Sequence, residues 1–418
     1  MTLPRFIQIH SLSSYPAALL NRDDSGMAKR LPFGGSTRTR ISSQSLKRHW
    51  RFAGESSHEA AARVPFSLQG LGLPMGERTK EIVQGAILPA AMKDLPGIHP
   101  RVQAAVTEAL LVALYGKNGA DPKSRQALFF GHPEVDYLAV LARELLQLGV
   151  EALGPLAAAA EPDKAGLKTL AETLKGRLKD VHKNLVALTG GAGLESALFG
   201  RMVTSDPAAN KEAPVHVAHA FTVHAMERDL DFATAVDDLR NRDPEADSGS
   251  AGMFDVELTS GLFYGYVNVD IHLLVANLGG DAAMAGQVVG RLLQLIARVS
   301  PGAKKGSTAP FAHAEWLMVE LGDDQPRTLA NAFRKAVPLR DGGGDVFGAA
   351  MQALQTHVQQ LDAAYGVQTQ RAQLSVTPPA LAGLAPQPLS GLVAWMQATL
   401  AAGAANAAGE PVADTLAA

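Results

Sequence analysis

Residues 21–51 carry a charge opposite in sign to that of the rest of the chain. This stretch, NRDDSGMAKRLPFGGSTRTRISSQSLKRHWR, holds eight Lys or Arg and two acids, a net charge of +6, whereas the remaining residues together carry −9. Cations gathered in one stretch without a local run of acids attract anions, and an extended polyanion such as a nucleic acid engages many of them at once. Residues 21–51, called here the basic segment, are therefore the first candidate for a binding surface.

The second half of the basic segment is expected to form a helix that positions these cations. Ser42 or Ser43 can cap its N-terminus by accepting a backbone N–H. Helical spacing then places four side chains on one face: Gln44, Lys47, Arg48 and Arg51. Three apolar residues share another face that the helix can bury: Leu46, Trp50 and Ala53. A helix start with free N–H groups and a basic face suits phosphate, although a merely solvated charged face is the alternative.

The residues before this helix add cations from a different element. Arg38 and Arg40 alternate with neutral residues, so an extended strand would present both arginines on one side. The Gly34-Gly35 pair breaks the chain just before them and leaves Lys29 on a loop. Three successive elements thus offer positive charge, which favours a polyanion as the partner.

Composition limits the other classes of function. With 418 residues, 47% apolar and 19% charged, the chain is long enough for a substantial core, and its net charge of −3 confines any nucleic-acid surface to a local groove. The absence of cysteine excludes disulfides, thiolate zinc sites and cysteine nucleophiles. No signal peptide and no apolar run of membrane-spanning length is seen, so we expect a cytoplasmic protein without a membrane partner.

The pattern along the chain predicts an α+β fold. Residues 6–12 alternate as a half-buried strand, with apolar Ile7 and Ile9 between polar Gln8 and His10. The further expected elements are a helical insertion to residue 189, strands in 213–223 and 261–274, an acidic excursion between them, a helix in 281–300, a basic loop at 301–308 and a strand at 315–321. Without its insertions this order approximates β-α-β-β-α-β, the ferredoxin-like arrangement also used by RNA-recognition domains.

Several motifs together resemble one family. NRDD, FGG and TRISSQSLKR are similar, almost letter for letter, to the N-terminal signature of the CasC family, the guide-RNA-binding backbone subunit of the type I-E CRISPR surveillance complex, Cascade. Further matches follow in order: Gly200-Arg201-Met202, Ala218-His219-Ala220, TAVDDL from Thr234, SGLFY from Ser260, Asn277-Leu278-Gly279-Gly280, Pro301-Gly302-Ala303-Lys304 and Ala330-Asn331-Ala332-Phe333. The resemblance covers residues 5 to about 337.

The resemblance implies a right-hand architecture. An RNA-recognition-like (RRM-like) palm would comprise residues 1–56, 190–225 and 261–397, helical fingers residues 57–189 and a protruding thumb residues 226–260. We expect a disordered tail in the Ala-rich residues 398–418.

The resemblance also implies a function without catalysis or cofactor. Copies of such a subunit polymerise along one CRISPR guide RNA and grip its backbone, while each thumb flips out a base at regular intervals. The splayed guide segments then pair with target DNA, and other Cascade subunits complete the complex. Indifference to base sequence fits this role, because phosphate contacts fix register but read no bases.

The same resemblance implies functions for individual residues. The implied backbone-gripping residues are Lys29, Ser42, Gln44, Lys47 and Arg48, with Met202 in the Gly200-Arg201-Met202 match and Lys304 in the basic loop; Lys305 substitutes for a second loop cation. In the thumb, Phe232 is followed by Ala233 where the family has adjacent bulky aromatics, so the wedge against the bases is expected to rest on Phe232, Thr234 and Val236. The thumb acids Asp237 and Asp238 are expected to face the palm of a neighbouring copy.

Other chemistries receive less support. Asp23 and Asp24 occupy the palm loop in which related type III subunits hold a catalytic aspartate, so a metal-dependent target-RNA ribonuclease is the alternative function. These acids otherwise shape the loop by pairing with nearby cations. His216 and His219 point to opposite faces of a strand, which disfavours a metal site. A generic single-strand binder outside CRISPR also stays open.

Overall fold

A computed structural model describes residues 2–53, 65–93, 95, 97–153, 164–188, 192–203, 210–236, 250–339 and 345–409. The chain forms two compact units. The first comprises Met1–Leu71, Val215–Ile271 and Ala282–Ala418, and the second comprises Gly72–Pro214 and His272–Asp281. We call them the sheet unit and the helical unit.

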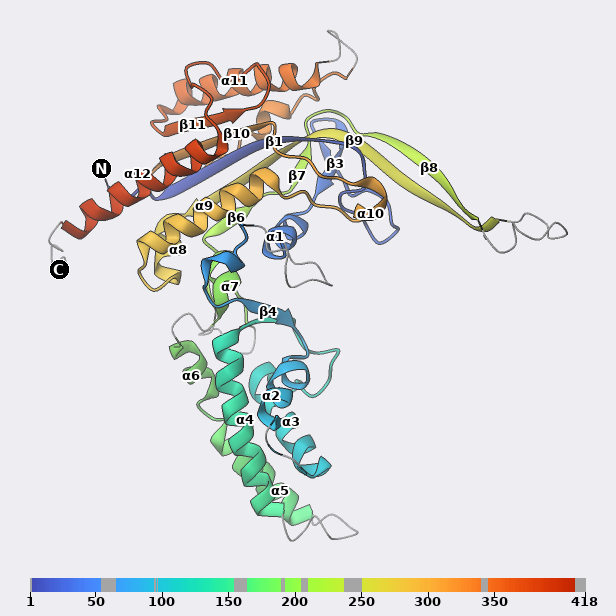
Figure 1. Ribbon diagram of the computed structural model, residues 1–418, viewed down its shortest axis with the longest axis vertical. Coiled ribbons are helices and arrows are strands. Elements are labelled where there is room, and N and C mark those ends of the chain that lie inside the picture. Colours follow the sequence, from blue (N-terminus) through green and yellow to red (C-terminus); the bar gives the residue numbers. More distant parts are fainter. Residues whose placement is uncertain are drawn as a thin grey trace. The chain divides into compact units, whose positions relative to one another are not determined.

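The sheet unit is built on a nine-stranded antiparallel sheet in the order β11-β10-β1-β9-β7-β3-β2, with β6 and β8 also paired to β9 (Figure 1). Its strands are β1 (Phe6–Ala18), β2 (Arg30–Phe33), β3 (Ser36–Ile41), β6 (Val215–Val217), β7 (Ala220–Thr222), β8 (Glu227–Val236), β9 (Ser250–Asp270), β10 (Trp316–Gly322) and β11 (Gln370–Ser375). This arrangement of an antiparallel sheet with helices agrees with the expected α+β class.

Strand β1 lies between β10 and β9, with Ile9 opposite Val319 on one side and Val267 on the other. The expectation of a half-buried strand was wrong, because Gln8 and His10 are as buried as their apolar neighbours, at 2% and 0% exposed. Their polar groups are paired within the fold: the Gln8 Oε1 atom accepts hydrogen bonds from the Tyr266 hydroxyl at 2.9 Å and from a backbone N–H at 2.7 Å. A central strand covered on both faces can hold polar residues when each has partners.

A buried ion-pair network centred on Glu320 of β10 lies on the same face of the sheet as His10. The Glu320 carboxylate is fully buried and accepts from His10 Nε2 at 3.0 Å, Arg327 at 3.0 and 3.1 Å, and Arg371 Nε at 2.6 Å. Burial alone would raise the pKa of Glu320, but the His10 hydrogen bond and the two arginine charges hold this pKa far below its usual range. The carboxylate is therefore ionised in the folded protein.

Helices cover both faces of this sheet. They are α1 (Ser43–Arg51), α9 (Ala282–Arg298), the single turn α10 (Lys305–Thr308), α11 (Val346–Tyr365) and α12 (Leu389–Gly409), with 3-10 turns at Gln69–Leu71 and Ala330–Phe333. One core joins α11 to the sheet through Leu12, Tyr264, Trp316 and Leu354. A smaller core on the α1 side includes Ile41 and Phe263.

The expected disordered tail was wrong as far as residue 409. Helix α12 continues through the Ala-rich stretch, and Leu392, Met396 and Leu400 fall one turn apart and are buried. Alanine has the highest helix propensity, and this apolar stripe gives the helix a face to pack. Residues 410–418 lie outside the described part of the chain.

Strand β8 and the first half of β9 form a two-stranded ribbon, paired from Glu227 with Ser260 to Val236 with Ser250. It extends beyond the other strands of the sheet unit in Figure 1. We call it the β8–β9 ribbon. Residues 237–249 between its strands, including Asp237 and Asp238, lie outside the described residues.

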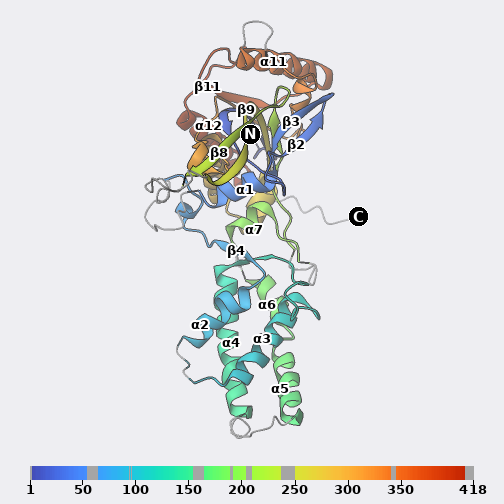
Figure 2. The same cartoon turned by 90° about the vertical axis from the view of Figure 1, so that its right-hand side faces the viewer.

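The helical unit contains a separate core. Its elements are β4 (Gly76–Thr79), a π-helix (Val83–Ile87), α2 (Leu88–Met92), α3 (Pro100–Tyr115), β5 (Leu128–Gly131), α4 (His132–Leu153), α5 (Lys164–Arg177), α6 (Val181–Ala187) and α7 (Gly193–Phe199), and most of α8 (Ile271–Asn277) also belongs to it. Helices α3, α4 and α5 run alongside one another (Figure 2) and bury Val106, Leu145 and Leu174. None of the described helices is long and apolar enough to cross a membrane.

Replacing Glu320 with Gln should lower the free energy of unfolding by about 3 kcal/mol, because the half-buried Arg327 and Arg371 lose the charge of Glu320 and keep, among the described residues, only Asp362 as a counter-charge. The loss should be visible in urea denaturation at neutral pH. Since the folded-state pKa of Glu320 is depressed, its stabilisation is fully present above the ordinary glutamate pKa of about 4.3 and declines as the pH falls below that value.

The matched control is Glu315→Gln, because Glu315 makes no ion pair within the described residues. Its effect should stay within about 0.5 kcal/mol. Equal effects of the two substitutions would contradict the structural role of the network.

Candidate nucleic-acid interface

Helix α1 begins as the sequence indicates. Ser42 is the N-cap: its Oγ accepts the Ser45 N–H at 3.3 Å, and its own N–H donates to Asn21 Oδ1 at 2.9 Å. Ser42 is only 6% exposed, so its hydroxyl lies just beneath the surface at the helix start. The cap ties the beginning of α1 to the first residue of the basic segment.

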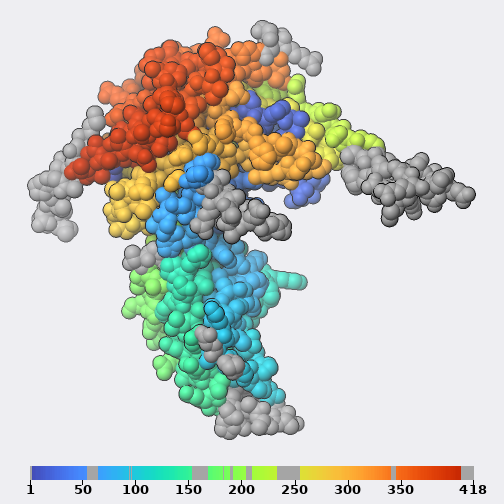
Figure 3. Space-filling view, viewed as in Figure 1, coloured from blue at the N-terminus to red at the C-terminus, as the bar shows by residue number. Residues whose placement is uncertain are grey.

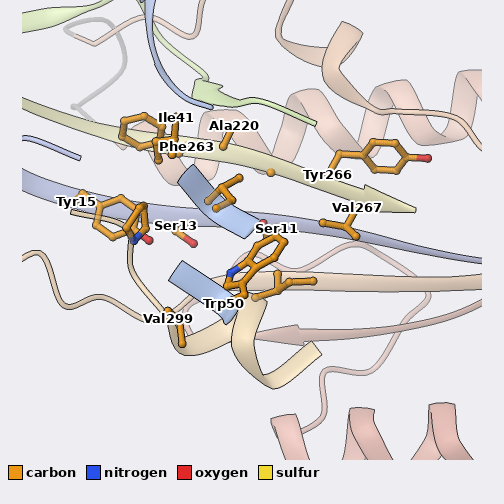
Figure 4. Close-up of a pocket in the computed structure, with 14 residues that line it drawn as sticks. Ser11, Ser13, Tyr15, Ile41, Trp50, Ala220, Phe263, Tyr266, Val267 and Val299 are labelled. Carbon is orange, nitrogen blue, oxygen red and sulfur yellow. The ribbon is translucent and has the colours of Figure 1, made fainter. Parts of the chain in front are cut away.

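The apolar face of α1 fixes the helix on the sheet. Trp50 is 3% exposed and points toward β1 and β9 (Figure 4). Leu46 lines the same cavity as Trp50. This cavity has a volume of about 40 Å³ and is lined also by Ile41, Tyr15 and Phe263. This gap is too small for a nucleotide, so any nucleic-acid contact must be made on the outer surface of α1.

The outer face of α1 presents three of the four side chains expected there. Gln44 and Arg48 are exposed, and Lys47 is half-buried, which lowers the pKa of its ammonium through loss of solvent. The Arg48 guanidinium lies 5.4 Å from the ring centre of Phe52, which is itself 42% exposed. A cation held over an aromatic ring keeps a defined position while remaining open to a ligand.

Two of the expected cations are not on this surface. Arg38 is fully buried and donates to the Thr222 carbonyl at 3.0 Å and the Phe333 carbonyl at 2.9 Å. Arg51 is 8% exposed and lies 4.9 Å over the Phe52 ring. The prediction that Arg38 and Arg51 offer their charges to a polyanion was therefore wrong. Arg38 instead ties β3 to distant backbone carbonyls, and its loss of solvent lowers its pKa.

Arg40 and Lys29 flank the start of α1 together with an imidazole. The Arg40 Nη1 atom lies 3.2 Å from His219 Nδ1, and the Ser43 N–H donates to the same nitrogen at 3.3 Å. Loss of solvent and the charges of Arg40 and Lys29 lower the pKa of His219. The neutral ring accepts at Nδ1 and therefore carries its hydrogen on Nε2, which makes His219 a further donor beside these cations.

The loop at residues 301–308 reaches the same helix. The Gly302 N–H donates to His49 Nε2 at 3.3 Å, and His49 Nδ1 in turn donates to the Ser45 carbonyl at 2.7 Å. Lys304 and Lys305 are exposed on this loop, which lies on the molecular surface in orange in Figure 3. Loss of solvent and the charge of Arg48 lower the pKa of Lys305, so these two cations are electrostatic neighbours.

These elements assemble one surface from three parts of the chain. Its cations are Lys29, Arg40, Lys47, Arg48, Lys304 and Lys305, which we call the basic surface. The nearby Arg30 is neutralised instead, because its Nη2 atom lies 2.7 Å from the buried Glu257 carboxylate of the β8–β9 ribbon. The sequence did not indicate His49 or His219, although the Ala218-His219-Ala220 motif was a signal for the latter.

The remaining predicted contacts lie on other elements. Met202 is 64% exposed and belongs to the helical unit, where the neighbouring Arg201 pairs with Glu134 at 2.7 Å. Phe232 is 61% exposed on β8, and Leu230, two residues earlier on the same face, is 53% exposed. Thr234 and Val236 also belong to β8, but their side chains lie outside what the structure describes.

Asp23 shapes its loop through backbone amides. Its Oδ1 accepts the Ser25 N–H at 2.9 Å and the Met27 N–H at 3.0 Å, a local turn rather than the expected pairing with a cation. Asp24 is exposed. Among the described residues, no cluster of three or more His, Asp or Glu is arranged to hold a metal ion.

Replacing His49 with Ala should reduce hydrogen-exchange protection of the Gly302 amide near neutral pH, because the acceptor that holds the loop is removed. In the unsubstituted protein, protection should fall as the pH drops through the pKa of His49, which burial places below the ordinary histidine value of about 6.5. Protonation of Nε2 replaces the acceptor with a donor.

His313→Ala is the control, since His313 is exposed on the chain just after this loop. It should leave the protection of Gly302 unchanged. An unaltered Gly302 amide in His49→Ala would show that His49 does not anchor the loop.

Comparisons with known proteins bear on this geometry. A family model described as CT1975-like protein matches residues 7–391. A comparison with curated proteins gave no match. A solved structure titled "CRISPR RNA-guided surveillance complex, pre-nicking" aligns with a TM-score of 0.71 and 28% identity, over 95% of this chain and 100% of that one. Another, titled "CRISPR RNA-guided surveillance complex", aligns with a TM-score of 0.64 and 24% identity, over 94% and 99% of the two chains.

Proposed function

The chain belongs to the CT1975-like protein family, and from this premise we propose that it is a non-catalytic backbone subunit that holds the guide RNA of a CRISPR surveillance complex. The basic surface is the observation that carries this proposal. It gathers cations from residues 29–48 and from residues 304–305, which are more than 250 positions apart in the sequence. Folding thus builds a concentrated positive site in a chain whose net charge is −3.

The basic surface suits the sugar-phosphate backbone rather than the bases. It offers long cationic side chains, the Gln44 amide and the His219 Nε2–H, which bind phosphate oxygens without selecting a base. A guide RNA has an arbitrary spacer sequence, so its carrier must bind every sequence similarly while base pairing supplies specificity. The similarity of the whole chain to a subunit of an RNA-guided complex supports this assignment.

The architecture fits an RRM-like palm. The central strands β10, β1, β9 and β7 are connected through α1 between β1 and β7 and through α9 between β9 and β10. This is the β-α-β-β-α-β succession of ferredoxin-like domains. From the resemblance we assign the palm to residues 1–56, 190–225 and 261–397, the fingers to residues 57–189 and the thumb to residues 226–260, which includes the β8–β9 ribbon. The two compact units divide the chain differently, because residues 65–71 belong to the sheet unit and residues 192–203, 210–214 and 272–281 belong to the helical unit.

The finer parts of the proposal follow from the CasC resemblance. Copies of the chain would polymerise along one guide RNA in a cytoplasmic type I-E Cascade, together with other subunits. The exposed Phe232 of the β8–β9 ribbon would contact a flipped base, with Thr234 and Val236 beside it. Guide segments between the flipped bases would then pair with target DNA.

Substituting Arg48 or Lys47 with Gln should weaken RNA binding by a similar factor for every RNA sequence. Each substitution removes one phosphate contact, so the slope of log affinity against log salt should become shallower by about 0.7. Fluorescence anisotropy with several single-stranded RNAs over a salt series measures both quantities.

Lys117→Gln serves as the control, because Lys117 is an exposed lysine of the helical unit. It should preserve affinity and slope. A loss of affinity in Arg48→Gln that depends on base sequence would contradict backbone recognition.

Substitution of Asp23 or Asp24 distinguishes the ribonuclease alternative from the proposed non-catalytic function. Asp23 already accepts two backbone N–H groups, which favours a role in shaping the loop. RNA complementary to a bound guide should therefore remain intact in Mg²⁺ with both the unsubstituted protein and Asp23→Ala. Cleavage by the unsubstituted protein that disappears in Asp23→Ala or Asp24→Ala would show that the protein is a ribonuclease rather than a non-catalytic subunit.

A further inference from the structure

Phe311 exposes a large apolar side chain beside the loop of the basic surface. The ring is 75% exposed, and it follows the sequence Lys304-Lys305-Gly306-Ser307-Thr308-Ala309-Pro310. Neither the predicted site residues nor the β8–β9 ribbon include it. A single exposed apolar residue is ordinary in a soluble protein, so its significance depends on how it is held and on what surrounds it.

The backbone on both sides of Phe311 is fixed. The next residue, Ala312, donates its N–H to Ser300 Oγ at 2.9 Å, and the Ser300 hydroxyl donates back to the Ala312 carbonyl at 2.9 Å. The Phe311 N–H itself donates to the Ala309 carbonyl at 2.7 Å. Because these bonds hold the backbone, the segment that carries the ring loses little backbone freedom when the ring binds a partner.

Ala309, two residues before Phe311, has an unusual backbone conformation. Its φ of 40° lies in the left-handed region, which a residue with a Cβ rarely adopts and which costs roughly 1 kcal/mol or more. This residue ends the single turn α10 and precedes Pro310. Strained backbone positions are found preferentially at active sites and ligand-binding sites.

The loop brings this part of the chain to the cations. A Cβ built on Gly302 would meet the Lys305 side chain at 2.7 Å and the Pro310 ring at 2.9 Å, so Lys305 and Pro310 pack around the same glycine. Gly302 is held by His49 of α1, and Lys305 is close enough to Arg48 for the two charges to interact. Phe311 therefore follows directly on a segment that packs against the loop cations and α1.

The surroundings identify the kind of partner. The residues that directly flank Phe311 are small, Ala309, Pro310 and Ala312, and the loop before them exposes cationic or small residues, namely Lys304, Lys305, Gly306 and Ser307. A protein partner would be expected to cover a wider apolar patch, whereas single-stranded RNA offers both a phosphate for the lysines and a flat base for the ring. Stacking of a base on an aromatic side chain tolerates every base, as a variable guide requires.

We propose that Phe311 stacks on a base of the bound RNA strand next to the phosphates held by Lys304 and Lys305. This inference rests on the proposed function, since it assumes that the basic surface binds RNA. It adds a base contact in the sheet unit that is separate from Phe232 of the β8–β9 ribbon.

The test compares two probes of equal charge: an oligoadenylate, and an oligonucleotide of the same length made of abasic ribose phosphates. The unsubstituted full-length chain should bind oligoadenylate more tightly. Phe311→Ala should weaken binding of oligoadenylate about tenfold, and binding of the abasic probe much less. The salt slope should be unchanged, because no charge is removed.

Phe311→Tyr should retain the affinity, and Tyr365→Ala, which removes a ring that is 79% exposed on α11, should have no effect.

Each other outcome decides against the inference. Equal loss for both probes would mean that Phe311 only shapes the loop. Unchanged RNA affinity with reduced self-association in sedimentation would mean that the ring contacts a second copy of the chain. In either case the Arg48→Gln effect would still support RNA binding at the basic surface, whereas an unsubstituted chain that binds neither probe would overturn the proposed function as well.

Discussion

The hydrogen bond between His49 and Gly302 is the interaction on which the candidate site depends. It joins α1, whose residues come early in the chain, to a loop that follows α9. His49 can accept this bond because its other ring nitrogen donates to the Ser45 carbonyl within α1, which fixes the neutral tautomer. Two segments distant in sequence thereby place their cations on one surface. The loop is also held by the Ala303 N–H, which donates to the Leu19 carbonyl at 2.9 Å, while the bond to His49 links the loop directly to α1.

Assembling like charges has an energetic cost that the fold must offset. The lowered pKa values of Lys47 and Lys305 reflect loss of solvent, and for Lys305 also the neighbouring charge of Arg48. Buried apolar contacts hold the elements in place despite this repulsion, above all Trp50 beneath α1. A bound phosphate backbone would relieve the repulsion, so the arrangement is more favourable with a polyanion than without one.

Helical spacing in the sequence correctly predicted which side chains of α1 are exposed and which are buried at the site, with Arg51 as the exception. Helical spacing placed Gln44 and Arg48 on one face and Trp50 on another, and the structure confirms this. The CasC resemblance, carried by TRISSQSLKR and the later motifs, is confirmed by the family match. In contrast, the alternation of residues 37–41 wrongly predicted that Arg38 is exposed. Arg38 is buried because it donates to the carbonyls of Thr222 and Phe333, which lie far along the chain. The roles of His49 and His219 likewise require contacts that no short pattern contains.

The most direct measurement is purification of the tagged chain from cells that express its neighbouring genes and a CRISPR array, followed by sequencing of the RNA that accompanies it. A backbone subunit should retain intact, guide-length RNA with varied spacers and repeat-derived ends, together with other subunits. Recovery of no RNA, or of RNA without repeat-derived ends, would contradict the account and would mean that the basic surface serves a different polyanion.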